Sequence, residues 1–282
     1  MDDRAHLVRA GAIWIVVAIV ADLIVGFLVA PHMPPGNFSN TASDQTHINN
    51  VLALIMTPIG VGVITFLVYA LVRFRQPPGP LQDGPPVRGH RSLQVGWVGV
   101  TASIVIVLAI LGTIELVQAP DSSAGAGAGG GQGPTPISRP SGNPLVVQVI
   151  AQQWQFTYRF PQYGGVETFS LALPVGRTVE FNVTSIDVIH SFWAYQLGVK
   201  ADAVPGANNI AYTTPKKVGL FQIRCAELCG LWHGWMAAKG HVLSRAGWAH
   251  WIAHARVANA PATHYLPPYA KVYYPAPLER GG

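Results

Sequence analysis

Three long apolar runs in the first 120 residues constrain this chain more than any other feature. They cover residues 11–30, 51–72 and 93–117, and each is at least about 20 residues long, which as a helix crosses a hydrocarbon core. Half of all residues are hydrophobic and only 11% are charged, as expected when lipid surrounds part of a chain. We therefore expect residues 1–120 to be a region of three transmembrane helices.

Arginines mark one end of these helices. Four of them lie in the short connection between the second and third runs, at Arg73, Arg75, Arg88 and Arg91. The positive-inside rule places such a loop in the cytoplasm. Everything after residue 117 then lies on the periplasmic or extracellular side of a multi-pass protein in a bacterial or archaeal-type cell membrane.

The first run has two interpretations. It is either a retained helix or a cleaved leader ending near Ala30, a small residue at a signal-peptidase position. Asp22 sits in its middle, where a carboxylate costs roughly 2.5–3.5 kcal/mol on insertion scales, so it should face protein. We expect a neutral carboxyl hydrogen-bonded to a neighbouring helix; a proton path or a subunit contact is the functional alternative. Pro58 should kink the second run.

The second half of the chain is typical of a β-rich domain. Residues 121–144 are rich in Gly, Ser and Pro and predict a flexible linker. Trp154, Phe156, Tyr158 and Phe160 alternate, which places them on one face of a strand. Further short strands are expected at residues 145–151, 168–173, 178–184, 191–195, 209–213, 220–224 and 236–243. This spacing favours a sandwich or barrel over residues 145–257, closed by a helix at 245–257 that Ser244 caps, with an extended tail at 258–282.

Candidate metal ligands cluster late in this domain. Cys225, Cys229, His233 and Met236 fall at i, i+4, i+8 and i+11, and the two cysteines are the only ones in the chain. Sulfur beside imidazole suits copper, and the Met argues against zinc. The second Cys suggests two metals bridged by two sulfurs, with His190 as the candidate for the missing ligand. By count alone, two exported cysteines would instead suggest a disulfide.

The same stretch resembles the copper A loop of cytochrome c oxidase subunit II, whose pattern is C-x-E-x-C-G-x-x-H-x-x-M. All six fixed positions match: Cys225, Glu227, Cys229, Gly230, His233 and Met236. Residues 187–193 are similar to the family's segment with the first histidine, 200–206 to its K-x-D-x-x-P-G turn, and 153–158 to its aromatic strand. The resemblance covers most of the chain from about Leu52 to Trp251.

The resemblance implies a fold, a ligand set and a function. The fold is transmembrane helices followed by an all-β cupredoxin-like sandwich. The resemblance also implies that Cys225 and Cys229 are thiolates that bridge two coppers and that His190 and His233 each bind one copper. Met236 and the Glu227 carbonyl would be weak axial ligands. The Glu227 carboxylate would bind a magnesium ion shared with the catalytic subunit, and Trp154 would be the first electron acceptor. The chain would take electrons from cytochrome c or another small redox protein and pass them to haem in the catalytic subunit, which reduces oxygen to water and translocates protons.

Alternatives remain open at this level. The same loop would serve the copper A subunit of a nitric oxide reductase, and Gln94, where oxidases often have Glu, leaves that reading available. From another class, the chain would be a membrane-anchored copper carrier or a zinc-stabilised binding module. A quinol oxidase subunit is disfavoured because such relatives lack these ligands. His250 and His254, at i and i+4 on the last helix, have no third ligand nearby and are expected to be solvated.

Charge bears on the partners. The formal net charge is +5 with no Lys/Arg run, which gives no support for nucleic-acid binding. Between Leu145 and Arg256 there are five acidic and nine basic residues, so carboxylates that would attract a basic donor are scarce. We expect a donor whose docking face is neutral or acidic, or one held in a supercomplex.

Overall fold

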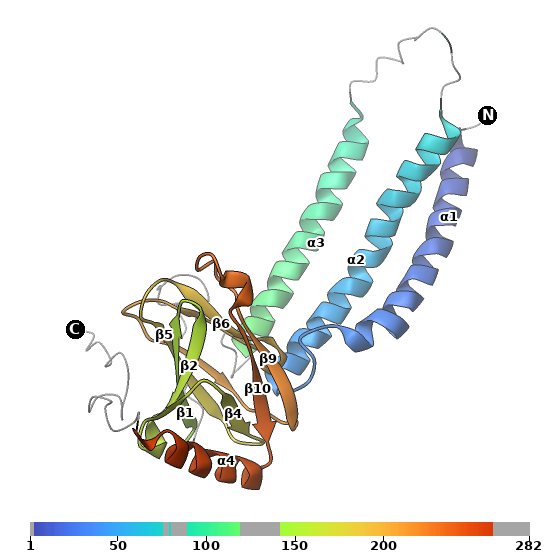
Figure 1. The fold of residues 1–282 in the computed structure, drawn as a ribbon. Helices are drawn as coiled ribbons and strands as arrows, with labels where there is room; N and C mark the ends of the chain where they lie inside the picture. The colour runs from blue at the N-terminus through green and yellow to red at the C-terminus, as the bar shows by residue number, and fades with distance from the viewer. Residues whose placement is uncertain (1–2, 76–78, 80–88, 119–141, 262–282) are drawn as a thin grey trace. The chain divides into compact units, whose positions relative to one another are not determined.

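Two units make up the chain in its computed structural model, which describes residues 3–75, 79, 89–118 and 142–261 (Figure 1). One unit comprises Met1–Met33 and Asn49–Gln118, and the other comprises Pro34–Ile48 and Ala119–Gly282. The predicted linker, apart from residues 142–144, lies outside the described residues. So do the loop position Arg88 and the predicted tail beyond residue 261.

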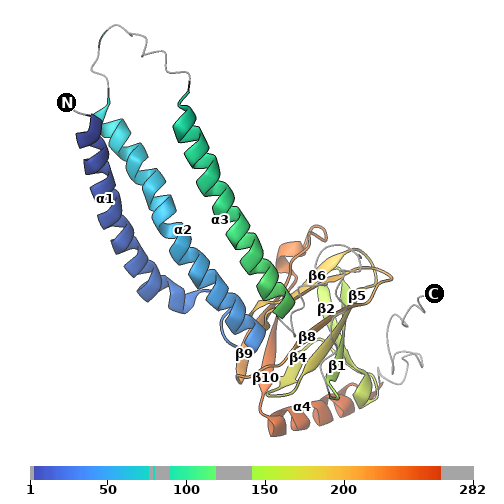
Figure 2. The ribbon, with the colours of Figure 1, turned by 180° about the vertical axis from the view of Figure 1, so that it is seen from behind.

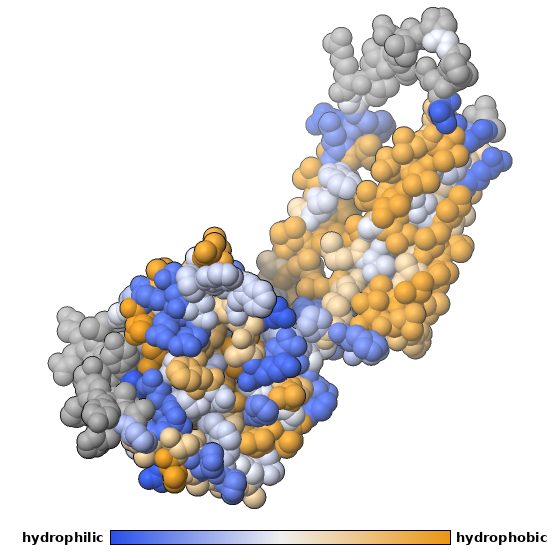
Figure 3. Space-filling view, viewed as in Figure 1, coloured by the Kyte–Doolittle hydropathy of each residue, from blue (hydrophilic) through white to orange (hydrophobic). Residues whose placement is uncertain are grey.

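The first unit is helical. Its long helices are α1 (Asp3–Ile24), α2 (Asn40–Arg73) and α3 (Arg91–Gln118), and a π-helical turn (Val25–Val29) and a short 3-10 turn (Ala30–His32) continue α1. All three are long and apolar enough to cross a membrane, which confirms the three predicted helices. Their surface is almost continuously hydrophobic, whereas the sandwich surface is mixed (Figure 3).

Three features of helices α1 and α2 bear on the predictions. Trp14 Nε1 donates a 2.8 Å hydrogen bond to the carbonyl oxygen of Pro58, which lies inside an α2 that continues on both sides of it. Oδ1 of Asp22 is buried and has no hydrogen-bond partner among the described residues. The predicted bond from Asp22 to a neighbouring helix is therefore wrong for this oxygen. Helix α2 begins at Asn40, well before the apolar run at 51, because Ser39 caps it by accepting from Ala42 N–H at 3.0 Å.

The second unit is built on two five-stranded sheets (Figure 2). The first sheet has the order β3 (Val166–Thr168), β2 (Gln155–Phe160), β1 (Leu145–Gln152), β5 (Val179–Ser185), β8 (Asn209–Thr213). The second has the order β4 (Leu171–Pro174), β10 (Ala237–Leu243), β9 (Gly219–Cys225), β6 (His190–Ala194), β7 (Val199–Ala203). Strand pairs β1–β5 and β4–β10 are parallel, and the other pairs are antiparallel.

The core lies between the sheets and is rich in aromatic rings. Phe192 of β6 contacts Phe156, Tyr158 and Phe181 from the other sheet, with ring centroids 5.6, 6.3 and 5.2 Å away. Phe156, Tyr158 and Phe160 are buried, as their alternation predicts. Trp154 lies just before β2 and is only partly buried against this core.

One strand prediction is wrong, and one strand is not predicted. Residues 168–173 form two strands, β3 and β4, which belong to different sheets. The chain turns between them because Thr168 Oγ1 both donates to Ser170 O and accepts from Ser170 N–H, each at 2.8 Å. Strand β7 was missed, since its sequence was interpreted only as a family turn. It pairs with β6 from His190↔Ala203 to Ala194↔Val199.

Helix α4 (Arg245–Ala258) packs on the sandwich by one face. Ser244 Oγ accepts from Gly247 N–H at 3.1 Å, so the predicted cap is present. Trp248 is buried and its Nε1 donates to Ala172 O of β4 at 3.1 Å. His250 and His254 are exposed on the other face.

The segment before α2 also packs on the sandwich. Ser39 is fully buried, and its Oγ donates to Leu197 O at 2.7 Å. Lys216 N–H donates to Phe38 O at 2.8 Å, and Ser39 forms an isolated antiparallel β-bridge with Pro215. A stretch before the second helix thus completes a domain whose strands lie more than 100 positions later in the chain.

Candidate metal centre

Three strand ends meet at one end of the sandwich. Strand β9 ends at Cys225, β10 begins at Ala237, and the loop between them carries Cys229, His233 and Met236. Strand β6 begins at His190 and runs antiparallel to β9, with Phe192 opposite Cys225. Because antiparallel neighbours start and finish at the same edge, His190 comes next to the thiol of Cys225.

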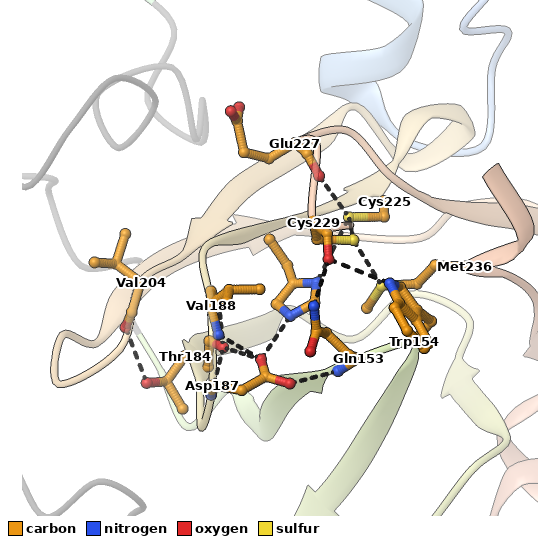
Figure 4. A network of polar contacts seen from close by, with 12 residues as sticks. Gln153, Trp154, Thr184, Asp187, Val188, Val204, Cys225, Glu227, Cys229 and Met236 are labelled. Atoms are coloured by element: carbon orange, nitrogen blue, oxygen red, sulfur yellow. Dashed lines mark hydrogen bonds and ion pairs between the residues drawn. The ribbon is translucent and has the colours of Figure 1, made fainter. Parts of the chain in front are cut away.

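The side-chain donors converge, and Figure 4 shows Cys225, Cys229 and Met236 close together. The two sulfurs are 3.8 Å apart, Cys225 Sγ is 3.9 Å from His190 Nδ1, and Cys229 Sγ is 3.5 Å from His233 Nδ1. Met236 Sδ lies 3.8 Å from Cys229 Sγ. Ligand atoms of His190, Cys225 and Cys229 all lie within 4.8 Å of one another, as in a metal-binding group.

Burial shields four of these five side chains from water, whereas His233 is only partly buried. The exposed fractions are 0% for His190, 8% for Cys225, 3% for Cys229 and 2% for Met236. Both cysteines are free thiols, and their separation of 3.8 Å is far beyond the ~2.05 Å of a disulfide bond. Burial, and then the neighbouring Cys225, raise the pKa of the Cys229 thiol to about 12. Two thiolates side by side here would need a cation to stabilise them.

Asp187 fixes the orientation of His190. Its Oδ1 lies 2.8 Å from Nε2 of His190 and also accepts from Val188 N–H at 2.6 Å. Oδ2 accepts from Gln153 N–H at 2.6 Å. Partial burial works to raise the pKa of Asp187, but these hydrogen bonds and one from Ser185 outweigh it and lower the pKa. An ionised carboxylate only accepts, so Nε2 carries the proton and the Nδ1 lone pair faces the sulfurs.

The loop that holds Cys229 is anchored by the turn between β1 and β2. The Cys229 carbonyl accepts from Gln153 Nε2 at 2.8 Å and from Trp154 Nε1 at 3.2 Å. Gly230 follows with φ of +116°, and a Cβ there would lie 3.0 Å from Gln153 Nε2 and 3.4 Å from Trp154 Cζ2. Only glycine allows both this backbone angle and this approach.

Glu227 presents two different groups. Its carbonyl oxygen lies 3.2 Å from Cys225 Sγ, within the donor cluster. Its carboxylate points away from the sulfurs and is exposed (Figure 4). The residue therefore offers a backbone ligand to the cluster and leaves its charged group free for another partner.

The donor set fits copper. The set is soft and consists of two thiols, two imidazole nitrogens, one thioether and one backbone carbonyl, of which only the first four are strong donors. The adjacent sulfurs suit two metals that share both thiolates. The seven residues named from the sequence thus all lie at this end of the domain. The sequence-based reasoning missed the roles of Asp187 and Gln153. The only available signal was a carboxylate three residues before a candidate histidine.

Comparisons with known proteins agree with this picture. The family model described as cytochrome c oxidase subunit II, periplasmic domain, matches residues 168–239. The cytochrome c oxidase subunit 2 of Synechocystis sp. is 28% identical over 271 residues, which covers 79% of this chain and 80% of the relative. That of Thermostichus vulcanus is 29% identical over 267 residues, covering 81% and 80%.

One solved structure is a mixed disulfide intermediate between a thioredoxin-like protein and subunit II of cytochrome c oxidase. It is 32% identical and covers 41% of this chain and 94% of that chain, with a TM-score of 0.38. The geometry and the sequence matches together define a class: proteins with helices long and apolar enough to cross a membrane and a cupredoxin-like domain whose Cys and His cluster could bind a metal. Within that class, the chain belongs to the cytochrome c oxidase subunit II family.

Proposed function

We propose that this chain is the subunit through which electrons enter a haem-copper terminal oxidase. It would accept them on the outer side of the membrane from cytochrome c or another small redox protein. It would deliver them to haem in the catalytic subunit, where oxygen is reduced to water and protons are translocated. The supporting observation is the convergence of two thiols, two histidine Nδ1 atoms, a thioether and a carbonyl within about 4 Å of their neighbours.

These distances are compatible with the ligand assignment that the resemblance implies. Cys225 and Cys229 would bridge two coppers, His190 and His233 would each bind one, and the weak ligands would be Met236 and the Glu227 carbonyl. Bound in this way, the copper pair supplies a one-electron carrier. The protein's part is to keep its donors fixed, since electron transfer without bond making is fastest when the geometry barely changes. Asp187 holds His190, and Gln153 with Trp154 holds the Cys229 loop.

Trp154 is the proposed first acceptor from the donor. Its indole nitrogen hydrogen-bonds the carbonyl of Cys229, so one residue links the partly exposed indole to a thiolate ligand. The exposed Glu227 carboxylate would bind a magnesium ion shared with the catalytic subunit. Nine basic and five acidic residues between Leu145 and Arg256 favour a donor whose docking face is neutral or acidic.

Burial argues against a copper carrier. A carrier must present its ligands to a partner that takes the metal by ligand exchange. Here both sulfurs and His190 are almost completely enclosed. A zinc-stabilised module would have no use for the thioether of Met236 at 3.8 Å from Cys229 Sγ.

Electron paramagnetic resonance with copper quantitation on the full chain in detergent tests the proposal. We expect two coppers per chain that share one unpaired electron, with hyperfine structure from two equivalent nuclei. His190→Ala should abolish this signal, whereas His241→Ala, at an exposed position of β10, should leave it unchanged. A single copper with a mononuclear signal, or a Cys225–Cys229 disulfide without copper, would refute the proposed role.

A further inference from the structure

A cavity lies at the other end of the sandwich from the cysteine sulfurs. Strand β10 begins beside Met236 and ends at Leu243, where helix α4 starts. The cavity there has a volume of about 420 Å³ and is lined by Pro174, Gly176, Arg177, Arg245, Trp248 and Ala249. This volume is within the range of ligand pockets, roughly 300–1,000 Å³.

Two arginines reach this cavity from different elements. Arg245 is the first residue of α4, and a Cβ added to Gly176 would lie 3.5 Å from its Nη2, so its guanidinium lies against the Gly176 turn. Arg177 is the next residue, and its Nη1 donates to the hydroxyl of Tyr163 at 3.3 Å. The Tyr163 ring in turn packs edge-on against Trp248, with centroids 5.1 Å apart. The apolar wall of the cavity therefore also positions one of its cations.

Two lysines lie on a segment that contacts the Gly176 turn. The N–H of Gly176 donates to Pro215 O at 2.7 Å, which brings the following Lys216 and Lys217 near the same turn. Lys216 Nζ donates to Asn40 Oδ1 at 3.0 Å, and Lys217 Nζ lies 5.5 Å from the centroid of the Phe38 ring. All partners of these four cations that the structure provides are neutral.

Positive charge at this place is uncompensated. Over residues 3–75, 89–118 and 142–261, no carboxylate comes within ion-pair distance of Arg177, Arg245, Lys216 or Lys217. By contrast, Arg159 binds Glu167 through Nε at 2.9 Å and through Nη2 at 2.6 Å. Arg159 is thus paired with a carboxylate, whereas the guanidinium groups of Arg177 and Arg245 at the cavity have no carboxylate partner among the described residues.

We propose that this cavity binds a phosphate-bearing ligand between Arg177 and Arg245. Guanidinium groups offer forked N–H donors that match phosphate oxygens, and two of them from separate elements can hold one phosphate from two sides. Pro174 and Trp248 give the same cavity an apolar wall for the part of the ligand that carries the phosphate. A chain with membrane helices meets such groups both as phospholipid headgroups and as dissolved phosphates. The site is independent of the proposed copper centre.

Calorimetric titration of the full chain in a neutral detergent tests the inference. Three probes are compared at constant ionic strength: inorganic phosphate, short-chain phosphatidylglycerol and short-chain phosphatidylcholine. Arg245→Gln and Arg177→Gln should each weaken binding of a phosphate probe on the order of tenfold, the effect of losing one charge-assisted hydrogen-bonding group. Arg256→Gln, an exposed arginine at the far end of the same helix, is the matched control and should change affinity less than twofold.

The outcomes separate the two sources. Arginine-dependent binding of phosphatidylglycerol well above that of inorganic phosphate identifies a lipid headgroup site. Equal or tighter binding of inorganic phosphate identifies a site for a dissolved phosphate. Binding of every probe that is indifferent to Arg177 and Arg245, or equal losses in the Arg256 control, overturns the inference. Circular dichroism of each variant verifies that the fold is retained.

Discussion

The carboxylate of Asp187 connects two segments of the candidate metal centre. It accepts from His190 Nε2 on one strand and from the N–H of Gln153, just before β2, on another element. Gln153 then holds the Cys229 carbonyl through its side chain. One side chain outside the proposed ligand set therefore connects His190, through Gln153, to the Cys229 loop.

We predict that Asp187→Asn weakens copper binding by about 10–100-fold, the usual cost of losing the partner of a ligating histidine. The amide would point a donor at one of the N–H groups that the carboxylate now accepts from, and His190 would lose its preference for a proton on Nε2. Competition titration with a chelator measures the effect. Asp202→Asn, on β7, is the control, and equal affinities for both variants would contradict the proposed role.

Tyr158 carries a hydroxyl that the core does not use. Its ring is fully buried, and its Oη has no hydrogen-bond partner among the described residues. We predict that Tyr158→Phe keeps or raises the free energy of unfolding by up to about 1 kcal/mol, because a desolvated, unpaired group disappears. Tyr212→Phe, which removes a donor to Glu180 Oε2 at 3.2 Å, should instead lower it. Chemical unfolding followed by tryptophan fluorescence compares the two.

The buried hydroxyl of Tyr158 also predicts that stability falls at alkaline pH. Burial raises the pKa of Tyr158 far above its ordinary value of 10.0, so above that pH the unfolded chain loses this proton while the folded chain keeps it. Its contribution to stability is complete below pH 10 and declines above it, by up to about 1.4 kcal/mol per pH unit. Stability of the unmodified chain should therefore fall more steeply above pH 10 than that of Tyr158→Phe. Parallel slopes would contradict this.

At the scale of elements, the sequence predicts what a repeating pattern specifies. Apolar runs of membrane length predicted three helices, alternation predicted β2, and Ser244 predicted the start of α4. Strand β7 was not predicted, because its short segment between Gly and Pro was interpreted only as a family turn. The break between β3 and β4 escaped because it depends on the Thr168 hydroxyl, which turns the chain from one sheet to the other.

The candidate site also has one part that the sequence displays and one part that only the fold brings together. The spacing of Cys225, Cys229, His233 and Met236 is local, so the sequence displays it. The approach of Asp187, Gln153 and Trp154 depends on how β2 and β6 come together across the two sheets. No periodicity of one segment contains that information, which is why the supporting residues appear only in three dimensions.

Strand β10 contains a glycine that makes room for an aromatic ring. Gly240 lies opposite Phe221 of β9, and a Cβ there would overlap that buried ring. We predict that Gly240→Ala lowers the free energy of unfolding by about 1–3 kcal/mol, as overpacking does. Gly234→Ala, where nothing lies within 4 Å, is the matched control. Chemical unfolding of both variants checks this, and equal midpoints would mean that the Phe221 ring moves aside freely.

On the scale of the whole molecule, the β-sandwich unit is discontinuous in sequence. It includes Pro34–Ile48, which contains the start of helix α2. Phe38 packs against Gly219, where a Cβ would lie 3.2 Å from its ring, and the hydroxyl of Ser39 is buried at Leu197. The polar stretch between the first two helices gave no sign of this in the sequence, since it has neither a period nor a long apolar run.

We predict that Ser39→Ala loosens this segment by about 1 kcal/mol, the cost of one buried hydrogen bond and a helix cap. Hydrogen exchange should report it as a roughly fivefold loss of protection at the N–H groups of Ala42 and Lys216. The former donates to Ser39 Oγ and the latter to Phe38 O. Ser103→Ala, whose hydroxyl bonds only within α3, is the control. Unchanged exchange at both amides would show that Phe38 alone anchors the segment.

The anchoring of Ser39 also sets an order of events during biosynthesis. The ribosome releases this residue 158 positions before Leu197, whose carbonyl it binds. Helices α2 and α3 are synthesised in between, so the Ser39 segment cannot complete its packing until the strands that follow them have been made. The sandwich can therefore complete its fold only with a segment that was synthesised before helices α2 and α3.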